Sequence, residues 1–117
     1  MSVTLFSALL LGATLLTALV AGLLFAYAVI TMPGIGKLGD REFVRAFQVM
    51  DRIIQNSHPL FILTWVGSGL LLLGSVVLGV GLLPRALWSA LIVATVAYFV
   101  GVQLPTLLIN VPLNNAL

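Results

Sequence analysis

The chain has 117 residues, of which 62% are hydrophobic and only 7% are charged, and its formal net charge is +2. Soluble domains carry about 25% charged residues, so this composition excludes a soluble globular protein and predicts an integral membrane protein surrounded by a lipid bilayer. The net charge comes from only five basic and three acidic side chains, so it gives no indication of nucleic-acid binding, and we expect no nucleic-acid partner. The absence of cysteine excludes disulfides and thiolate metal sites.

Three apolar segments are long enough to cross a bilayer, which requires about 20 helical residues. They cover residues 5–32, 59–83 and 86–109. Small residues recur every three or four positions along the third segment, and such stripes allow helices to approach closely in lipid. The stripe consists of Ala86, Ala90, Ala94, Ala97 and Gly101. We therefore expect an all-α fold, an antiparallel transmembrane bundle that forms one domain over residues 1–117.

The connection between the first two segments contains most of the charged residues. Within residues 40–55 the apolar side chains repeat every three or four positions, which places them on one face of a helix. They are Phe43, Phe47, Met50 and Ile54. This pattern predicts an amphipathic helix that lies along the membrane surface or covers the mouth of the bundle.

Basic residues in short loops favour the cytoplasmic side of a membrane. Four of the five lie in the first connection and the last lies in the second: Lys37, Arg41, Arg45, Arg52 and Arg85. We predict a protein of the bacterial inner membrane, with the N-terminus outside and with residues 33–58 and the C-terminus in the cytoplasm. The carboxamides near the C-terminus would then meet the charged connection on one face of the membrane.

His58 is the only side chain that titrates near neutrality when it is unperturbed. It is therefore a candidate general base at the bundle mouth, and the alternative is an interfacial histidine bonded to water or a neighbouring carbonyl. Gln103 precedes Pro105, which leaves the Gly101 carbonyl without its usual helical donor. Either Gln103 or Thr106 repairs the helix locally, or the Gln103 amide points inward to hold a substrate oxygen.

Pro112 lies among three carboxamides and favours an irregular turn. Irregular backbone at membrane depth must be covered by protein or line a wet cavity. Asn110, Asn114 and Asn115 therefore either clamp this turn or contact a substrate.

Aromatic side chains inside the spans have two interpretations. Tyr27, Trp65 and Tyr98 could form a flat aromatic-lined pocket, and the alternative is packing in the core. We expect no metal site, because a metal requires three or four clustered ligands and the chain has one histidine and three acids. None of the acids lies in a span, so a proton-coupled transporter would lack its carboxylate.

Three stretches, "AGLLFAYAVITMPGIG", "FVRAFQVMDRIIQNSHPLF" and "NVPLNNAL", make the chain similar to the anthrone oxygenase-like family of small membrane proteins, many of them of unknown function. The resemblance covers nearly the whole chain, and its most specific part is the closing Asn-x-Pro-Leu-Asn. It implies a bundle of four spans. Residues 1–117 would then end before a fourth span, which either a longer chain or a partner subunit would supply.

Characterised relatives in this family oxidise anthrones to anthraquinones with dioxygen, without a metal or flavin. The resemblance thus implies a cofactor-independent oxygenase acting on polycyclic phenolic or quinone-like substrates. The residues expected at the site are His58 as base, Gln103 and Asn110 as oxyanion donors, and Tyr27, Trp65, Tyr98 and Asn114 around the substrate. The alternative is a non-enzymatic membrane subunit that binds a small molecule or assembles with itself or with other chains.

Overall fold

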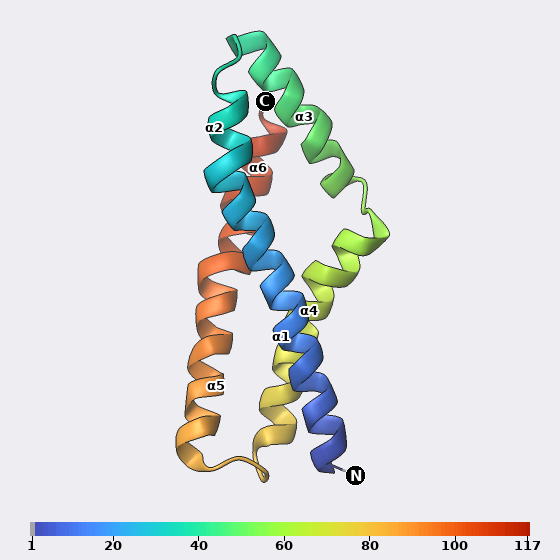
Figure 1. Ribbon diagram of the computed structural model, residues 1–117, viewed down its shortest axis with the longest axis vertical. Coiled ribbons are helices and arrows are strands. Elements are labelled where there is room, and N and C mark those ends of the chain that lie inside the picture. Colours follow the sequence, from blue (N-terminus) through green and yellow to red (C-terminus); the bar gives the residue numbers. More distant parts are fainter. Residues whose placement is uncertain (1) are drawn as a thin grey trace.

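The computed structural model describes residues 2–117, and these residues form helices joined by short turns, with no strand among them (Figure 1). Three helical stretches are long and apolar enough to cross a membrane: Val3–Ile35, Pro59–Gly79 and Arg85–Asn115. The predicted all-α membrane bundle with three spans is therefore confirmed.

The first stretch comprises α1 (Ser2–Ala26), the π-helical segment η1 (Tyr27–Thr31) and α2 (Met32–Ile35). The amphipathic helix α3 (Asp40–Gln55) has the bounds expected from its apolar repeat. The second stretch, α4 (Pro59–Gly79), ends four residues before the predicted limit at 83. The third stretch comprises α5 (Arg85–Tyr98), η2 (Phe99–Gln103), η3 (Thr106–Asn110) and α6 (Val111–Asn115).

The irregular turn expected around Pro112 is not formed, because the third stretch remains helical as far as Asn115. Proline lacks an N–H group, and its ring clashes with the carbonyl four residues earlier. A π-helical segment ends two residues before each of Pro33, Pro105 and Pro112. Hydrogen bonds to the residue five positions earlier widen the helix there, so the chain accommodates each proline without leaving the helix.

The tightest packing joins α1 to α4 through glycines. A Cβ atom at Gly12 would lie 2.9 Å from Leu71, and one at Gly67 would lie 2.9 Å from Leu16. The small-residue stripe of the third stretch, residues 86–101, is exposed instead. The third stretch meets α4 through larger side chains such as Trp88 and Gln103.

The three stretches differ in length. The 21 residues of α4 span about 31 Å, close to the bilayer's hydrocarbon thickness. The first stretch has 33 residues, about 50 Å of helix. Near the N-terminus the stretches meet, because a Cβ at Gly79 would touch both Phe6 and Trp88. The additional length therefore lies at the opposite end, beside α3.

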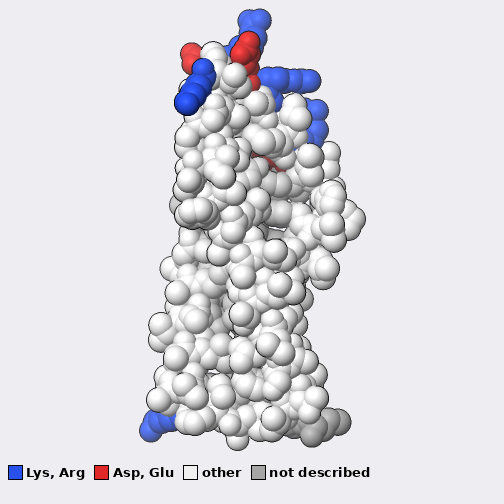
Figure 2. Space-filling model, viewed as in Figure 1, with Lys and Arg blue, Asp and Glu red and all other residues white. Residues whose placement is uncertain are grey.

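The end that carries α3 also carries most of the charge. Figure 2 shows the charged side chains gathered there, with one basic side chain at the opposite end. The C-terminus lies at the same end as α3 (Figure 1). The charged connection and the C-terminal carboxamides therefore share one end of the molecule, as the sequence predicts.

Candidate functional site

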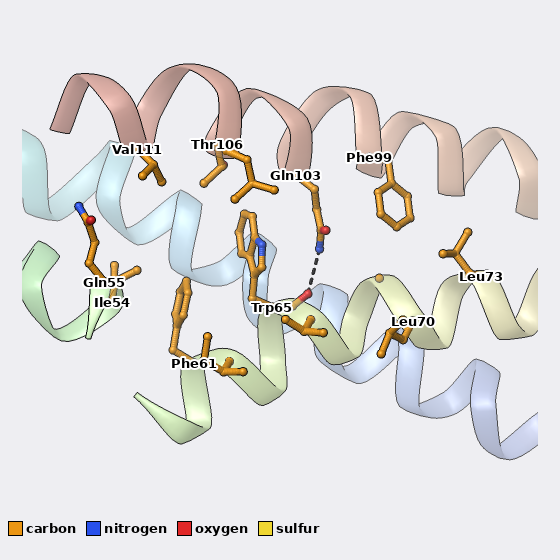
Figure 3. Close-up of a pocket in the computed structure, with 14 residues that line it drawn as sticks. Ile54, Gln55, Phe61, Trp65, Leu70, Leu73, Phe99, Gln103, Thr106 and Val111 are labelled. Carbon is orange, nitrogen blue, oxygen red and sulfur yellow. Dashed lines mark hydrogen bonds between the residues drawn. The ribbon is translucent and has the colours of Figure 1, made fainter. Parts of the chain in front are cut away.

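Two adjoining cavities lie between the helices at the α3 end. The side cavity has a volume of about 500 Å³ and lies between α4, the third stretch and the end of α3 (Figure 3). The mouth cavity has a volume of about 290 Å³ and is lined in addition by the end of α1 and by η1. The two cavities share six lining residues: Ile54, Gln55, Phe61, Trp65, Thr106 and Val111.

The wall between the two cavities is aromatic. Phe61 and Trp65, one turn apart on α4, stack with ring centroids 5.8 Å apart and an angle of 14° between the ring planes. Both rings extend from α4 toward the third stretch, where Thr106 and Val111 lie (Figure 3). Since Trp65 is buried, these rings offer a flat apolar surface inside the bundle rather than an interfacial anchor.

Gln103 connects the second and third stretches. Its Nε2 donates to the Trp65 carbonyl at 2.9 Å and contacts Ser68 Oγ at 3.5 Å (Figure 3). The Ser68 hydroxyl lies 2.8 Å from that same carbonyl and 2.7 Å from the Tyr98 hydroxyl. The Thr106 Oγ1 donates to the Val102 carbonyl rather than to that of Gly101, so neither Thr106 nor Gln103 makes the expected local repair. Gln103 thus lines the side cavity, but α4 already accepts hydrogen bonds from its amide nitrogen.

The mouth cavity contains a carboxylate held by carboxamides. Asp51 Oδ1 accepts from Asn114 Nδ2 at 3.3 Å, and Asp51 Oδ2 accepts from Gln55 Nε2. Asn110 and Tyr27 line the same cavity. We call these five residues the polar mouth. The bond from Asn114 to Asp51 joins the C-terminal part of the chain directly to α3.

Asp51 was not among the site residues predicted from sequence, although a signal for it exists. It lies four residues after Phe47 and three before Ile54, so it falls on the apolar face of the amphipathic helix. The other two acids, Asp40 and Glu42, lie in the first turn of α3. An acid on an apolar face is costly unless it is paired, and here the two carboxamides pair it.

His58 lines a hollow beside the polar mouth rather than the mouth cavity itself. It is exposed, and its Nδ1 accepts a hydrogen bond from the Leu60 N–H at 3.2 Å, which caps the start of α4. It lines a hollow with Met50 and Ile53, and this hollow shares Leu23, Tyr27, Ile54 and Phe61 with the mouth cavity. The residue before it, Ser57, has a φ of 61°, a left-handed conformation that turns the chain between α3 and α4.

The structure therefore gathers only part of the predicted site. Four of the seven predicted residues line the mouth cavity: Tyr27, Trp65, Asn110 and Asn114. Gln103 lines the adjoining side cavity, whereas Tyr98 lines a separate hollow against α1. Within residues 2–117, no three His, Asp or Glu side chains lie close enough together to hold a metal ion.

Comparisons with protein-family models, with curated proteins and with solved structures give no match to this chain. The resemblance to the anthrone oxygenase-like family therefore remains an expectation from the sequence.

Proposed function

We propose that this chain binds a flat, hydrophobic phenol or quinone-like molecule within the membrane and oxidises it with dioxygen, without a bound cofactor. The observation that carries the proposal is the side cavity, apolar and aromatic, opening into a polar mouth that contains one carboxylate and three carboxamides. Small-molecule sites commonly have this character, with volumes of about 300–1,000 Å³ and a few placed polar groups.

The two cavities suit the two parts of such a ligand. Fused rings would stack against Phe61 and Trp65, whose planes are nearly parallel. The ring oxygens would then reach the carboxamides of the polar mouth, which have N–H groups to donate. Exposed apolar residues at the rim of the side cavity, Leu70 and Leu107, would face lipid, so a membrane-dissolved substrate would arrive from the bilayer.

The reaction balances without a redox cofactor. Removal of one proton from the ring CH₂ of an anthrone leaves an electron-rich carbanion. Transfer of an electron to dioxygen and recombination of the resulting pair form a C–O bond, and protonation gives a hydroperoxide. Loss of water breaks the O–O bond and leaves a quinone carbonyl, so one dioxygen is consumed and one water released. The protein must supply a base and donors for the developing oxyanion.

The proposed setting is the bacterial inner membrane, with the polar mouth in the cytoplasm. The distribution of basic side chains supports this orientation, since the α2–α3 connection and α3 contain four of the five.

The test uses the purified chain in lipid nanodiscs with anthrone under oxygen. We expect anthraquinone to form faster than in empty nanodiscs, with one dioxygen consumed per quinone. Binding is measured separately by Trp65 fluorescence in a Trp88→Phe variant. We expect anthraquinone to quench this emission saturably. In the Trp65→Phe variant the remaining tryptophan is Trp88, which lies on α5 beside the far end of α4, so this variant should show only collisional quenching that does not saturate. Rates and quenching equal to the controls would refute the proposal.

A second candidate function is that of a membrane subunit that assembles with itself or with another chain. The observation that favours it is the exposed small-residue stripe, along which a Cβ at Gly101 would meet no atom within 4 Å. Such a stripe permits close helix contact in lipid. If this function holds, crosslinking in membranes should capture a defined oligomer, and Gly101→Leu should abolish it while leaving the monomer folded.

A further inference from the structure

The polar mouth contains a group suited to accept the substrate proton. Of the three acids in the chain, Asp51 is the one that lines the mouth cavity. It is partly buried, and each of its oxygens accepts one carboxamide hydrogen bond, from Asn114 and from Gln55. A carboxylate has about four lone-pair positions. Each oxygen therefore keeps capacity to receive a proton.

The carboxamides hold that carboxylate in place from two elements. Gln55 lies one turn along α3, and Asn114 reaches across from the end of the third stretch. The two bonds reach the carboxylate from different elements, so together they fix the orientation of the Asp51 oxygens at the cavity. A base fixed in this way meets the geometric requirement for proton abstraction.

A donor for the resulting oxyanion lies on the same cavity. Asn110 is exposed on the cavity wall and makes no side-chain hydrogen bond to the other residues between 2 and 117. Its amide N–H groups can donate to the ring oxygen on which negative charge develops. Tyr27, from η1, is the other ionisable side chain that lines this cavity with Asp51.

His58 lies in a different position relative to the cavity. Its Nδ1 is occupied by the Leu60 N–H. The hollow that it lines shares Tyr27 and Phe61 with the mouth cavity but does not include Asp51, Asn110 or Asn114. The imidazole therefore acts first as the cap of α4.

We infer that Asp51, rather than His58, is the catalytic base, with Gln55 and Asn114 as positioning residues; this inference rests on the proposed function. The Asp51 carboxylate takes one proton from the acidic ring CH₂ of the substrate, and the electron pair of that C–H bond remains on the ring carbon. After dioxygen adds to this carbon, the Asp51 carboxylic acid returns the proton to the peroxide anion. Asp51 is thus restored, and dioxygen is the only oxidant consumed.

The proton-transfer step is tested apart from oxidation. Under anaerobic conditions in D₂O, the wild-type chain in nanodiscs should accelerate exchange of the anthrone ring CH₂ protons above the rate in empty nanodiscs. Asp51→Asn, which keeps the size of the side chain, should lose about 100-fold of that acceleration, since general bases contribute about 10²–10⁴-fold. Asp51→Glu should recover part of it, and His58→Ala should keep it within about threefold.

Binding and oxidation distinguish the two ways in which the experiment can fail. Trp65 quenching by anthraquinone should be equal in wild type and Asp51→Asn, which shows that the cavity is intact. A wild-type chain that neither quenches nor oxidises refutes the proposed function itself. The other failure concerns Asp51 alone. If the wild-type chain oxidises anthrone, and the Asp51→Asn variant binds anthraquinone and still exchanges the anthrone protons at the wild-type rate, only the assignment of Asp51 is overturned. Loss of exchange in His58→Ala, with binding retained, would transfer the role to His58.

The positioning role has a readout of its own. Asn114→Leu removes one of the two donors that orient the carboxylate and should slow anaerobic exchange while Trp65 quenching by anthraquinone is retained. Asn114→Gln, which keeps an amide donor, should recover part of the exchange rate. The matched change Asn115→Leu, at an exposed neighbour, should leave the exchange rate unchanged. Equal exchange rates for wild type and Asn114→Leu would contradict the positioning role.

Discussion

Replacing Gln103 with leucine tests whether the buried amide holds the second and third stretches together. Gln103 is only 8% exposed, and leucine has a similar volume, so the main loss is its contacts to the Trp65 carbonyl and Ser68 Oγ, at 2.9 and 3.5 Å. Side-chain hydrogen bonds in membrane proteins contribute about 0.6 kcal/mol on average and about 1.7 kcal/mol at most. One good and one long contact therefore predict a loss of about 1 kcal/mol in the free energy of unfolding.

The remaining hydrogen bonds limit that loss. The Trp65 carbonyl still accepts from Ser68 Oγ at 2.8 Å, so the leucine variant does not leave this group without a side-chain donor. Ser68→Ala combined with Gln103→Leu removes both donors. Residues in one hydrogen-bond network usually couple by about 0.5–3 kcal/mol, and we expect the double variant to lose more stability than the sum of the single variants.

The assay is reversible unfolding in mixed micelles with increasing SDS, followed by tryptophan emission and far-UV circular dichroism. Val100→Ala is the control, because Val100 lies in the same π-helical segment but is exposed, and its change should stay within about 0.5 kcal/mol. Gln103→Leu as stable as the wild type, or single-variant losses that simply add in the double variant, would refute the view that this network joins the two stretches.

Two further predictions concern topology and packing. Cysteines placed at Arg45 and Asn114 should be labelled from the same side of sealed vesicles, and a cysteine placed at Arg85 should be labelled from the other side, because α3 and the C-terminus share one end of the bundle. Labelling of positions 45 and 114 from opposite sides would exclude the polar mouth. Gly69→Val should reduce stability by about 1–3 kcal/mol in the same unfolding assay, since a Cβ there would lie 3.1 Å from Phe99 Cζ. An unchanged unfolding midpoint would show that Phe99 moves aside freely.

The fold was predictable where the signal is local. The three spans follow from the length of the apolar runs, and α3 follows from its apolar repeat, because each pattern is complete within one element. The placement of α3 and the C-terminus at the same end follows from the number of spans, because two further spans after α3 return the chain to that end. The outward direction of the small-residue stripe was not predictable from spacing alone. A stripe of small residues indicates that another helix can approach closely. It does not say which face of the third stretch turns toward α4, because that depends on the larger side chains, such as Trp88, that bond to α4.

The candidate site was less predictable, because its contacts join residues far apart in the chain. The bond from Asn114 to Asp51 spans 63 positions, and no local pattern specifies it. His58 attracted the catalytic prediction because of its titration range, a property of the isolated side chain. Its place beside Pro59 and before α4 also suits a helix cap, which is the contact that the structure contains.

The positions of the site residues follow from the three prolines that come after π-helical segments: Pro33, Pro105 and Pro112. In water, proline inside a helical pattern usually ends the helix, and that reasoning predicted a turn at Pro112. In a bilayer an unpaired backbone group is far more costly, so the helix continues and widens instead, with donors five positions away. Each π-helical segment contains one predicted site residue that lines a cavity: Tyr27, Gln103 and Asn110. A polar residue shortly before a proline in an apolar span is therefore a stronger indication of a site than polarity alone, because the widened turn and the polar group occur together.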